Sequence, residues 1–430
     1  MSDDERDRDL DALLRQPAER LAPPDGSFAL VSRRARRRRF AKATVGVAAG
    51  VIVLAGAVPA VIAVRHNSND QSLAINDKTI PASRSRSGPS QSPSVQPKTP
   101  LTGFFPQSLS FVTSTEGYVW GSIGTSRRGV LARTLDGGTN WTKVGAPPVN
   151  FSSDGGNGDG QVRFAYSQDG FVFGSSYFAT RDGGTSWQRV PSPGYIDDLE
   201  TSHGQVWALV RPCETCRNVR LYSATVSSPS LTRVRHVPRM RSLAGADSIA
   251  LNYTTAGAVS VDILVGSSAF YTSVDGRHWK RGNNPCPTEV HGGTVQTALL
   301  STLNLGEVVA ACGYNVSGGA EDKRVLTTNS SGMHWQRTAT NPSVGGYLET
   351  LSAGTGSSLM IGSSRYGAQV SHDGGRTWKT DDASGIELSF VGFISLTHVV
   401  ALADRSDEEQ GAFATSNDSG RDWSVTPFPM

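Results

Sequence analysis

A short motif recurs along this 430-residue chain, and its spacing constrains the possible folds more than any other feature. The strings TLDGGTNW, TRDGGTSW, SHDGGRTW and SNDSGRDW begin at Thr134, Thr180, Ser371 and Ser416. Each has an Asp at its third position, a Gly at its fifth and a Trp at its eighth. Self-similarity at a fixed period is the signature of repeat architectures, so the period decides which architecture is possible.

The tryptophans measure this period. The successive intervals between Trp141, Trp187, Trp279, Trp335, Trp378 and Trp423 are 46, 92, 56, 43 and 45 residues. The double interval predicts a degraded copy near residue 232, in which Leu231 takes the place of the Trp and Val226 the place of the Asp. The chain therefore carries seven copies of one unit.

Each unit contains four short alternating runs. In the second copy these are QVRFAYS, FVFGSS, YFATR and WQRV, and the turns SQDG and DGGTS lie among them. Period-two alternation with Gly/Asp turns indicates antiparallel strands. Four strands repeated seven times predict an all-β, seven-bladed β-propeller over residues 104–430. An open solenoid is the alternative, but neither end of the repeat shows a polar capping unit, which favours a closed ring.

The motif T/S-x-D-x-G-x-x-W resembles the Asp-box, or BNR repeat, of sialidases, sortilin-type receptors, some endoglucanase-like hydrolases and Ycf48-type photosystem II assembly factors. The resemblance covers about three quarters of the chain and implies a propeller with its boxes on the periphery, away from a central ligand funnel. The matching positions are Thr134, Asp136, Gly138, Trp141, Thr180, Asp182, Gly184, Trp187, Asp373, Gly375, Trp378, Asp418, Gly420 and Trp423. Two copies depart from the pattern: that of Asp275 and Trp279 is one residue short, and that of Gly332 and Trp335 has Ser330 in place of Asp.

The residue types in the box have structural uses. An Asp side chain accepts hydrogen bonds from the N–H groups of its own turn. A Gly such as Gly138 allows a positive φ at no steric cost, and the Trp fills space against a neighbouring sheet. We therefore expect the box to serve the folding of one blade and to carry no active site.

The N-terminal part has a different character. Ser32–Lys42 holds seven basic residues and no acidic one, and 43–64 is a run of 22 residues without a charge. A helix of that length spans a hydrocarbon core of about 30 Å. The basic cluster on its N-terminal side predicts a single-pass cell-membrane protein with a cytoplasmic N-terminus and an extracellular propeller. A cleaved signal peptide is the alternative, but it normally has a shorter leading region and a shorter apolar run.

Two further segments complete the predicted domain organisation. Residues 1–42 form a cytoplasmic tail, in which Leu10, Leu13, Leu14 and Leu21 would share a helical face that docks on a cytosolic partner or lies on the membrane. A mostly disordered tail with its arginines against anionic lipid is the alternative. Residues 65–103, rich in Pro and Ser, predict a disordered linker.

All four cysteines, Cys213, Cys216, Cys286 and Cys312, lie in the predicted exported part. An even number outside the cytoplasm favours disulfides. We expect Cys213–Cys216 to staple a tight loop between strands, and Cys286–Cys312 to join an inter-blade loop to the second strand of the fifth blade.

No set of residues identifies an enzyme. A sialidase would need three carboxylate-binding arginines, a nucleophilic Tyr with a Glu partner and an F/Y-R-I-P sequence, and the nearest match is Arg189-Val190-Pro191. A glycoside hydrolase with a divergent site needs only two carboxylates across a cleft. The candidate acids are Asp197, Asp198, Glu200, Asp262, Glu289 and Glu349. We expect them to be solvated loop charges, because carboxylates are rarely buried unless paired.

Metals, cofactors and nucleic acid are not predicted either. The acidic loop 153–160 lacks calcium-loop spacing, no His/Cys zinc pattern occurs, and no phosphate-binding loop is present. The net charge of +3 and the absence of a basic stripe with aromatics on the propeller do not suggest nucleic acid. The sequence thus predicts a membrane-anchored scaffold that binds an envelope protein or a cell-surface glycan. The alternatives are a glycosidase and a transmembrane sensor acting through its tail.

Overall fold

The computed structural model describes residues 101–428, apart from 125, 127, 150–159, 214–215, 239, 242–246, 254–258, 266–268, 288, 291–292, 305–306, 318–319, 331, 344, 347, 355–356, 364–366, 381–385, 395–396 and 406–410. The regular secondary structure of this described part consists of the strands β1 to β30. No membrane-spanning helix is found among the described residues. The predicted tail, membrane helix and nearly all of the linker lie outside them.

The strands form seven antiparallel sheets, whose members are consecutive in the chain. Sheet 1 contains β1 (Phe104–Phe111), β2 (Gly117–Ile123), β3 (Val130–Thr134) and β4 (Thr142–Val144). Sheet 2 contains β5 (Gln161–Phe164), β6 (Gly170–Phe173), β7 (Tyr177–Thr180) and β8 (Gln188–Arg189). Sheet 3 contains β9 (Tyr195–Ser202), β10 (Gln205–Arg211), β11 (Asn218–Thr225) and β12 (Ser228–Arg233), with β13 (Met240–Arg241) paired to β11.

The remaining sheets follow the same order. Sheet 4 contains β14 (Asp247–Tyr253), β15 (Val259–Val265), β16 (Ala269–Ser273) and β17 (Lys280–Gly282). Sheet 5 contains β18 (Glu289–Val290), β19 (Gly293–Asn304), β20 (Glu307–Ser317), β21 (Ala320–Thr328) and β22 (Gln336–Arg337). Sheet 6 contains β23 (Leu348–Ala353), β24 (Leu359–Ser363), β25 (Gly367–Ser371) and β26 (Lys379–Thr380), and sheet 7 contains β27 (Ile386–Phe393), β28 (Val399–Arg405), β29 (Gly411–Ser416) and β30 (Ser424–Pro427).

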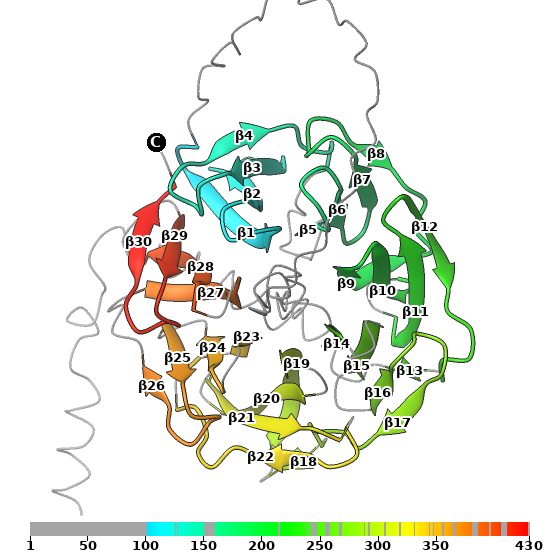
Figure 1. Ribbon diagram of the computed structural model, residues 1–430, viewed down its shortest axis with the longest axis vertical. Coiled ribbons are helices and arrows are strands. Elements are labelled where there is room, and N and C mark those ends of the chain that lie inside the picture. The colour runs from blue at the N-terminus through cyan, green and yellow to red at the C-terminus, as the bar shows by residue number, and fades with distance from the viewer. Residues whose placement is uncertain are drawn as a thin grey trace, which may run out of the picture. The chain divides into compact units, whose positions relative to one another are not determined.

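The seven sheets are arranged as blades around a common axis, with the first long strand of each blade innermost (Figure 1). The predicted seven-bladed all-β propeller is therefore confirmed. The degraded copy is a complete blade, blade 3, in which Val226 lies in the turn between β11 and β12. In blade 2 the predicted run QVRFAYS ends as a strand at Phe164, because the N–H groups of Ala165 and Tyr166 turn to the carbonyl of Asp169.

The hydrophobic core is divided among the junctions between blades. Phe171 and Phe173 of blade 2, for example, pack with Leu199, Val206 and other buried residues of blade 3. All eight residues of β9 are buried, because an innermost strand is covered on both faces by neighbouring blades. A blade thus buries its apolar side chains only when its neighbours are present.

The ring closes by packing and not by strand exchange. Blade 1 contains only the first strands of the ring and blade 7 only the last. The two blades meet through aromatic contacts, with ring centroids 5.0 Å apart for Phe104 and Phe428 and 5.2 Å apart for Trp141 and Phe413. Aromatic pairs at this separation stabilise a contact beyond the area that they bury.

Candidate functional site

The two ends of the ring are built from different connections. With β19 taken as the first strand of blade 5, one end of the ring holds the turns between the first and second strands and between the third and fourth strands of each blade; the latter contain the boxes, and we call this end the box face. At the other end lie the connections between the second and third strands and the crossings to the next blade, and we call this end the loop face.

The box turns share one hydrogen-bond pattern. The Thr134 hydroxyl donates to Asp136 Oδ1 at 2.8 Å and accepts the N–H of Gly138 at 2.9 Å. Asp136 Oδ1 also accepts the N–H of Asn140 at 2.8 Å. The equivalent bonds recur in blades 2, 6 and 7, around Asp182, Asp373 and Asp418. Desolvation raises the pKa of each of the four carboxyl groups, but these bonds outweigh it and hold each pKa below its ordinary value.

The two departing boxes keep the pattern by other means. Asp275, in the shortened copy, accepts the N–H groups of Arg277 and His278, each at 2.8 Å. Ser330 accepts the N–H of His334 at 2.9 Å through its hydroxyl. The turn therefore needs an acceptor at this position more than it needs a negative charge.

The glycine positions of the box have steric causes. Gly137 and Gly138 have φ values of 72° and 96°, which L-residues with a side chain rarely adopt. A Cβ atom on Gly138 would lie 1.9 Å from the Phe413 ring of blade 7, whereas one on Gly137 would come no closer than 3.3 Å to the Ser114 carbonyl. The second glycine is thus required by the neighbouring blade as well as by the backbone.

The box tryptophans also act between blades. The indole N–H of Trp187 donates to the carbonyl of Gly145 in blade 1 at 3.0 Å. Trp335 and Trp378 bond in the same way to carbonyls at the end of the preceding blade, at 2.8 and 3.2 Å. The expectation that every box residue serves one blade only is therefore too narrow. The indole nitrogens of Trp141, Trp279 and Trp423 have no partner among the described residues.

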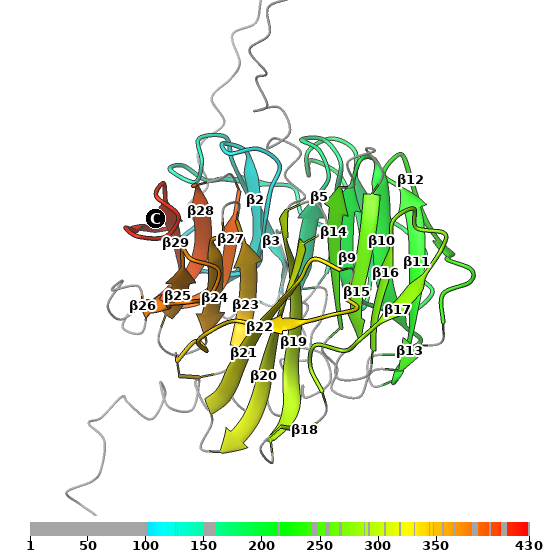
Figure 2. The same cartoon turned by 60° about the horizontal axis from the view of Figure 1, so that its bottom comes forward.

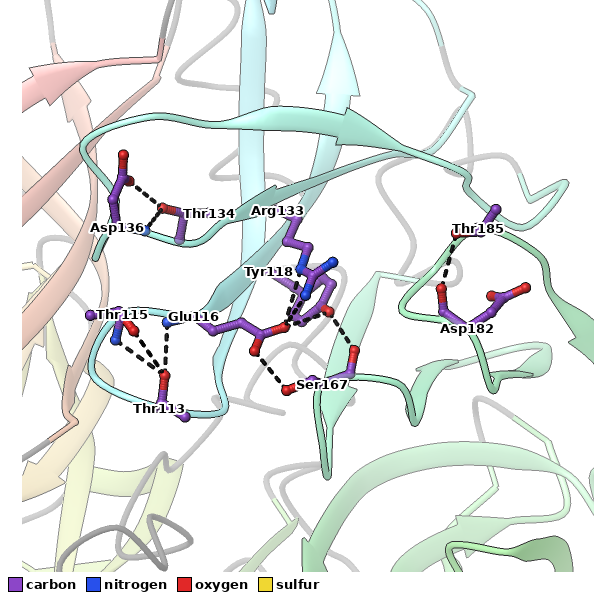
Figure 3. Close-up of polar contacts among 10 residues, drawn as sticks. All are labelled: Thr113, Thr115, Glu116, Tyr118, Arg133, Thr134, Asp136, Ser167, Asp182 and Thr185. Atoms are coloured by element: carbon purple, nitrogen blue, oxygen red, sulfur yellow. Dashed lines mark hydrogen bonds and ion pairs between the residues drawn. The ribbon is translucent and has the colours of Figure 1, made fainter. Parts of the chain in front are cut away.

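A Tyr–Glu–Arg cluster also lies at the box face, between blades 1 and 2 (Figure 3). Glu116 accepts from the Arg133 guanidinium at 2.6 Å and from the Ser167 hydroxyl of blade 2 at 2.6 Å. The Tyr118 hydroxyl donates to the Ser167 carbonyl at 2.7 Å, and its ring stacks on Phe164. Burial raises the pKa of Tyr118 well above its ordinary value, while the hydrogen bonds of Ser167 and Arg133 and the charge of Arg133 lower the pKa of Glu116 despite its own burial. A buried, bonded phenol of this kind joins two blades and is not presented as a nucleophile.

The loop face contains a groove of about 630 Å³ between blades 2 and 3. Three connections meet there: β6–β7 with Ser175, β8–β9 with Pro191, and β10–β11 with Cys213. Arg189 supplies a cation from β8, and Tyr195 lies at the start of β9. The volume lies within the range of ligand pockets, and the lining mixes apolar and polar groups.

A buried ion pair supports the wall of this groove. The Arg211 guanidinium binds the Asp197 carboxylate through Nε at 2.7 and 2.8 Å and also through Nη2. Arg211 also lies over the Tyr195 ring at 5.8 Å. Bidentate pairing fixes side-chain geometry, so Tyr195 is held in place from behind.

The acidic run 197–200 lies in a strand and not in a solvated loop, so that expectation is wrong. Asp197, Asp198 and Glu200 are all buried on β9. Arg163 from β5 neutralises Glu200 at 2.5 Å and donates to the Leu199 carbonyl at 3.2 Å. Burial raises the pKa of Glu200 to about 8, and the Asp198 charge adds to this rise while Arg163 opposes it.

Asp262 is also buried, on β15 next to Thr272 of β16, and burial raises its pKa to about 7. Glu289 and Glu349 belong to β18 and β23, but their side chains lie outside the described residues. Neither Asp262 nor the acids of β9 line the groove, and the described residues of its lining include no carboxylate. Arg211 lies 14 residues from Asp197 in the sequence, and Arg163 lies 37 residues from Glu200. No local sequence pattern indicates such pairs.

Both predicted disulfides are confirmed. Cys213–Cys216 joins the ends of the β10–β11 connection, and Cys286–Cys312 ties the crossing between blades 4 and 5 to β20. Cys213 is exposed and lines the groove, whereas Cys286 and Cys312 are completely buried. Both bridges therefore fix connections of the loop face.

Blade 5 forms an arm on the same face. Its strands β19, β20 and β21 have 12, 11 and 9 residues, and their ends extend beyond the strands of blade 6 (Figure 2). The start of β21 is fixed to the blade 5–6 crossing: Glu321 accepts the N–H of Leu348 at 2.7 Å, and Lys323 donates to the Gly346 carbonyl at 2.8 Å. Burial raises the pKa of Glu321 and lowers that of Lys323.

Within the described part of the ring, no group of three His, Cys, Asp or Glu side chains could hold a metal ion. Residues 153–159 of the acidic loop lie outside that part. Arg189, of the R-V-P sequence, is exposed on β8 at the groove.

Comparisons with known proteins identify the fold alone. No protein-family model and no curated protein matches the chain. The structure of Ycf48 from Cyanidioschyzon merolae is 14% identical with a TM-score of 0.50, over 74% of this chain and 96% of that one. Ycf48 bound to a D1 peptide is 17% identical with a TM-score of 0.49, over 74% and 94%. Puromycin hydrolase is 10% identical with a TM-score of 0.50, over 76% of this chain and 56% of that one. The propeller fold therefore occurs both in Ycf48 and in part of a hydrolase, and it does not decide the activity.

Proposed function

We propose that this chain is a membrane-anchored binding protein whose loop face holds a segment of a protein partner outside the cytoplasm. The observation that supports this most is the concentration of features on one face. The groove, both disulfides and the blade 5 arm all lie there. Connections fixed in advance lose little conformational entropy on binding, which favours affinity.

The lining of the groove favours a polypeptide ligand. Val190 and Pro191 offer apolar contacts, Ser175 and Ser192 offer hydroxyl groups, and Arg189 offers a positive charge. This mixture suits an extended segment with alternating polar and apolar side chains. A glycan remains the alternative ligand, and it would be recognised by the absence of a protein adduct in the experiment below.

The membrane anchor is supported by the uncharged run 43–64 and by the basic cluster before it. The external location of the propeller is supported by its two disulfides, which persist in oxidising compartments. We also propose that the box turns are Asp-box repeats with a purely structural role, which their shared hydrogen bonds support.

The test places a photo-crosslinking residue at Ser175, on the loop face, or at Thr185, on the box face of the same blade, in the full-length protein in its native membrane. We expect a discrete protein adduct from Ser175 and none from Thr185. Mass spectrometry of the adduct identifies the partner. Adducts of equal yield from both positions, or from neither, would contradict the proposal.

A charge reversal tests the groove itself. Arg189→Glu should lower the yield of the Ser175 adduct by about tenfold, because a like charge repels the partner that the cation attracts. Lys143→Glu is the matched control, because Lys143 is exposed at the equivalent position of blade 1 and does not line the groove. An equal effect of both reversals would mean that overall charge, and not the groove, controls the adduct.

A further inference from the structure

The two disulfides of the loop face differ in a way that suggests regulation. Cys213 is exposed and Cys216 partly exposed, while Cys286 and Cys312 have no exposed surface. A reductant must reach a sulfur atom to attack it, so access alone separates the two bridges. Cys213 is also one of the residues that line the groove.

The Cys213–Cys216 bridge contributes little to holding the propeller together. It closes a sequence separation of 3, whereas Cys286–Cys312 closes one of 26. A disulfide stabilises a protein mainly through the length of chain that it closes. The strands on either side, β10 and β11, remain paired from Gln205 with Thr225 to Val210 with Arg220. Opening this bridge therefore frees a turn and leaves the blade intact.

We propose that Cys213–Cys216 is a thiol-exchange site, which a dithiol reductant opens while the propeller stays folded, and that its opening changes what the groove binds. The second part rests on the proposed function of the groove. The first part depends only on access and topology.

The chemistry balances with a dithiol as the only co-reactant. A thiolate of the reductant attacks Sγ of Cys213, the more exposed residue of the pair, and the Cys213–Cys216 bond breaks. Cys216 leaves as a thiolate and takes a proton from solvent. The second thiolate of the reductant then attacks the mixed disulfide and releases Cys213, so the dithiol becomes a disulfide and the protein gains two electrons and two protons.

Opening affects the groove because the bridge holds Cys213, a residue of the groove lining, to Cys216. The N–H of Cys216 donates to the Cys213 carbonyl at 3.0 Å in the bridged turn. Pro212, also in the groove lining, directly precedes Cys213. The opposite walls, formed by β6–β7 and β8–β9, contain no cysteine and should not move.

The experiment titrates the full-length protein in its membrane with dithiothreitol, alkylates free thiols and identifies them by mass spectrometry. Cys213 and Cys216 should become alkylated at a concentration about tenfold lower than Cys286 and Cys312. Alkylation of all four cysteines at one concentration of dithiothreitol, together with unfolding, would overturn the proposal.

A second measurement separates the two parts. The Ser175 adduct should change in yield at least about threefold when only the exposed bridge is reduced. The double variant Cys213→Ser/Cys216→Ser should show the yield of the reduced protein and no response to dithiothreitol. An adduct that is unchanged by selective reduction would refute the regulation and leave the proposed function standing. Absence of the adduct in every state would refute the proposed function instead.

Discussion

The box face and the loop face belong to the same seven blades, yet the turns of the box face repeat from blade to blade and the connections of the loop face do not. On the box face, six blades repeat one turn with a side-chain oxygen acceptor, a positive-φ glycine and a tryptophan. On the loop face the described connections carry features that do not repeat: one connection carries an exposed disulfide, one is tied by a buried disulfide, and blade 5 extends as an arm. Repetition marks what every blade needs in order to fold, and the differences mark where this chain has become specialised.

The acidic residues show the same contrast. Box carboxylates accept several N–H groups and have lowered pKa values, because those bonds stabilise the charge. Asp262 and Glu200, in the interior, have raised pKa values, because burial penalises the charge. The two kinds of acid should therefore respond to pH in opposite directions.

The largest expected effect tests this opposition through Asp262→Asn. The pKa of Asp262 in the folded protein, about 7, lies above its ordinary value of 3.8, so folding takes up a proton between these values. The stability that this proton provides is present below about pH 4 and is lost as the pH rises through about 7. The uncharged Asn avoids that loss, so the variant should gain about 4 kcal/mol relative to the wild type between about pH 4 and pH 8.

Urea unfolding at several pH values measures this difference. Asp136→Asn is the control from the box face. Its effect on the free energy of unfolding should depend on pH in the opposite direction. Its carboxyl group has a lowered pKa, so its stabilisation is present at neutral pH and is lost as the pH falls through the folded value. Parallel pH profiles for the two variants would contradict the contrast between the two kinds of acid.

Substitution of box glycines should give the next largest effect. Gly138→Ala should cost about 3 kcal/mol, because the added Cβ meets the Phe413 ring in a backbone conformation that is already strained for alanine. Gly137→Ala should cost about 1 kcal/mol, since only the backbone strain applies. Equal costs, measured by denaturant unfolding, would mean that blade 7 does not constrain this turn.

The indole bonds between blades should have a smaller effect. Trp187→Phe removes the indole bond to the Gly145 carbonyl of blade 1 and the longer one to the Gly184 carbonyl of its own box, whereas Trp141→Phe removes none among the described residues. Both substitutions remove the same ring volume, so Trp141→Phe measures the effect of that volume on stability. We expect Trp187→Phe to lower the free energy of unfolding by about 1 kcal/mol more than Trp141→Phe does. A thermal unfolding series with both variants measures the difference, and an identical shift would deny the box a role between blades.

The smallest effect should come from restoring the degenerate box of blade 5. Ser330→Asp places a carboxylate where a hydroxyl now accepts the N–H of His334. The variant should be more stable by about 0.5 kcal/mol, because a charged acceptor strengthens the turn. A loss of stability in urea would show that blade 5 has adapted to serine.

The fold could be predicted from the sequence because the same residue types recur at a regular spacing in most blades. Trp, Gly and Asp are needed at fixed positions of each box turn, so their spacing reveals the number of blades even where one copy, around Val226, has lost them. The prediction of two disulfides followed from the cysteine count and the predicted exported location.

The loop face could not be predicted in the same way. The burial of Asp197 and Glu200 depends on Arg211 and Arg163, which reach them from other strands. The groove depends on three connections that meet only in the folded ring, and no period in the sequence marks them. The bonds of the box tryptophans to preceding blades were missed for the same reason, since they cross between units that the sequence presents as copies.

The absence of strand exchange between blades 1 and 7 has one more consequence. Since each blade is continuous in the chain, the order in which the blades are encoded can be rotated without altering a single sheet. A circular permutant that links the C-terminal end of blade 7 to Leu101 and begins instead at another crossing would convert the present aromatic seam into a covalent junction. Whichever junction is left without a peptide bond then becomes the point at which the ring first opens under force or heat.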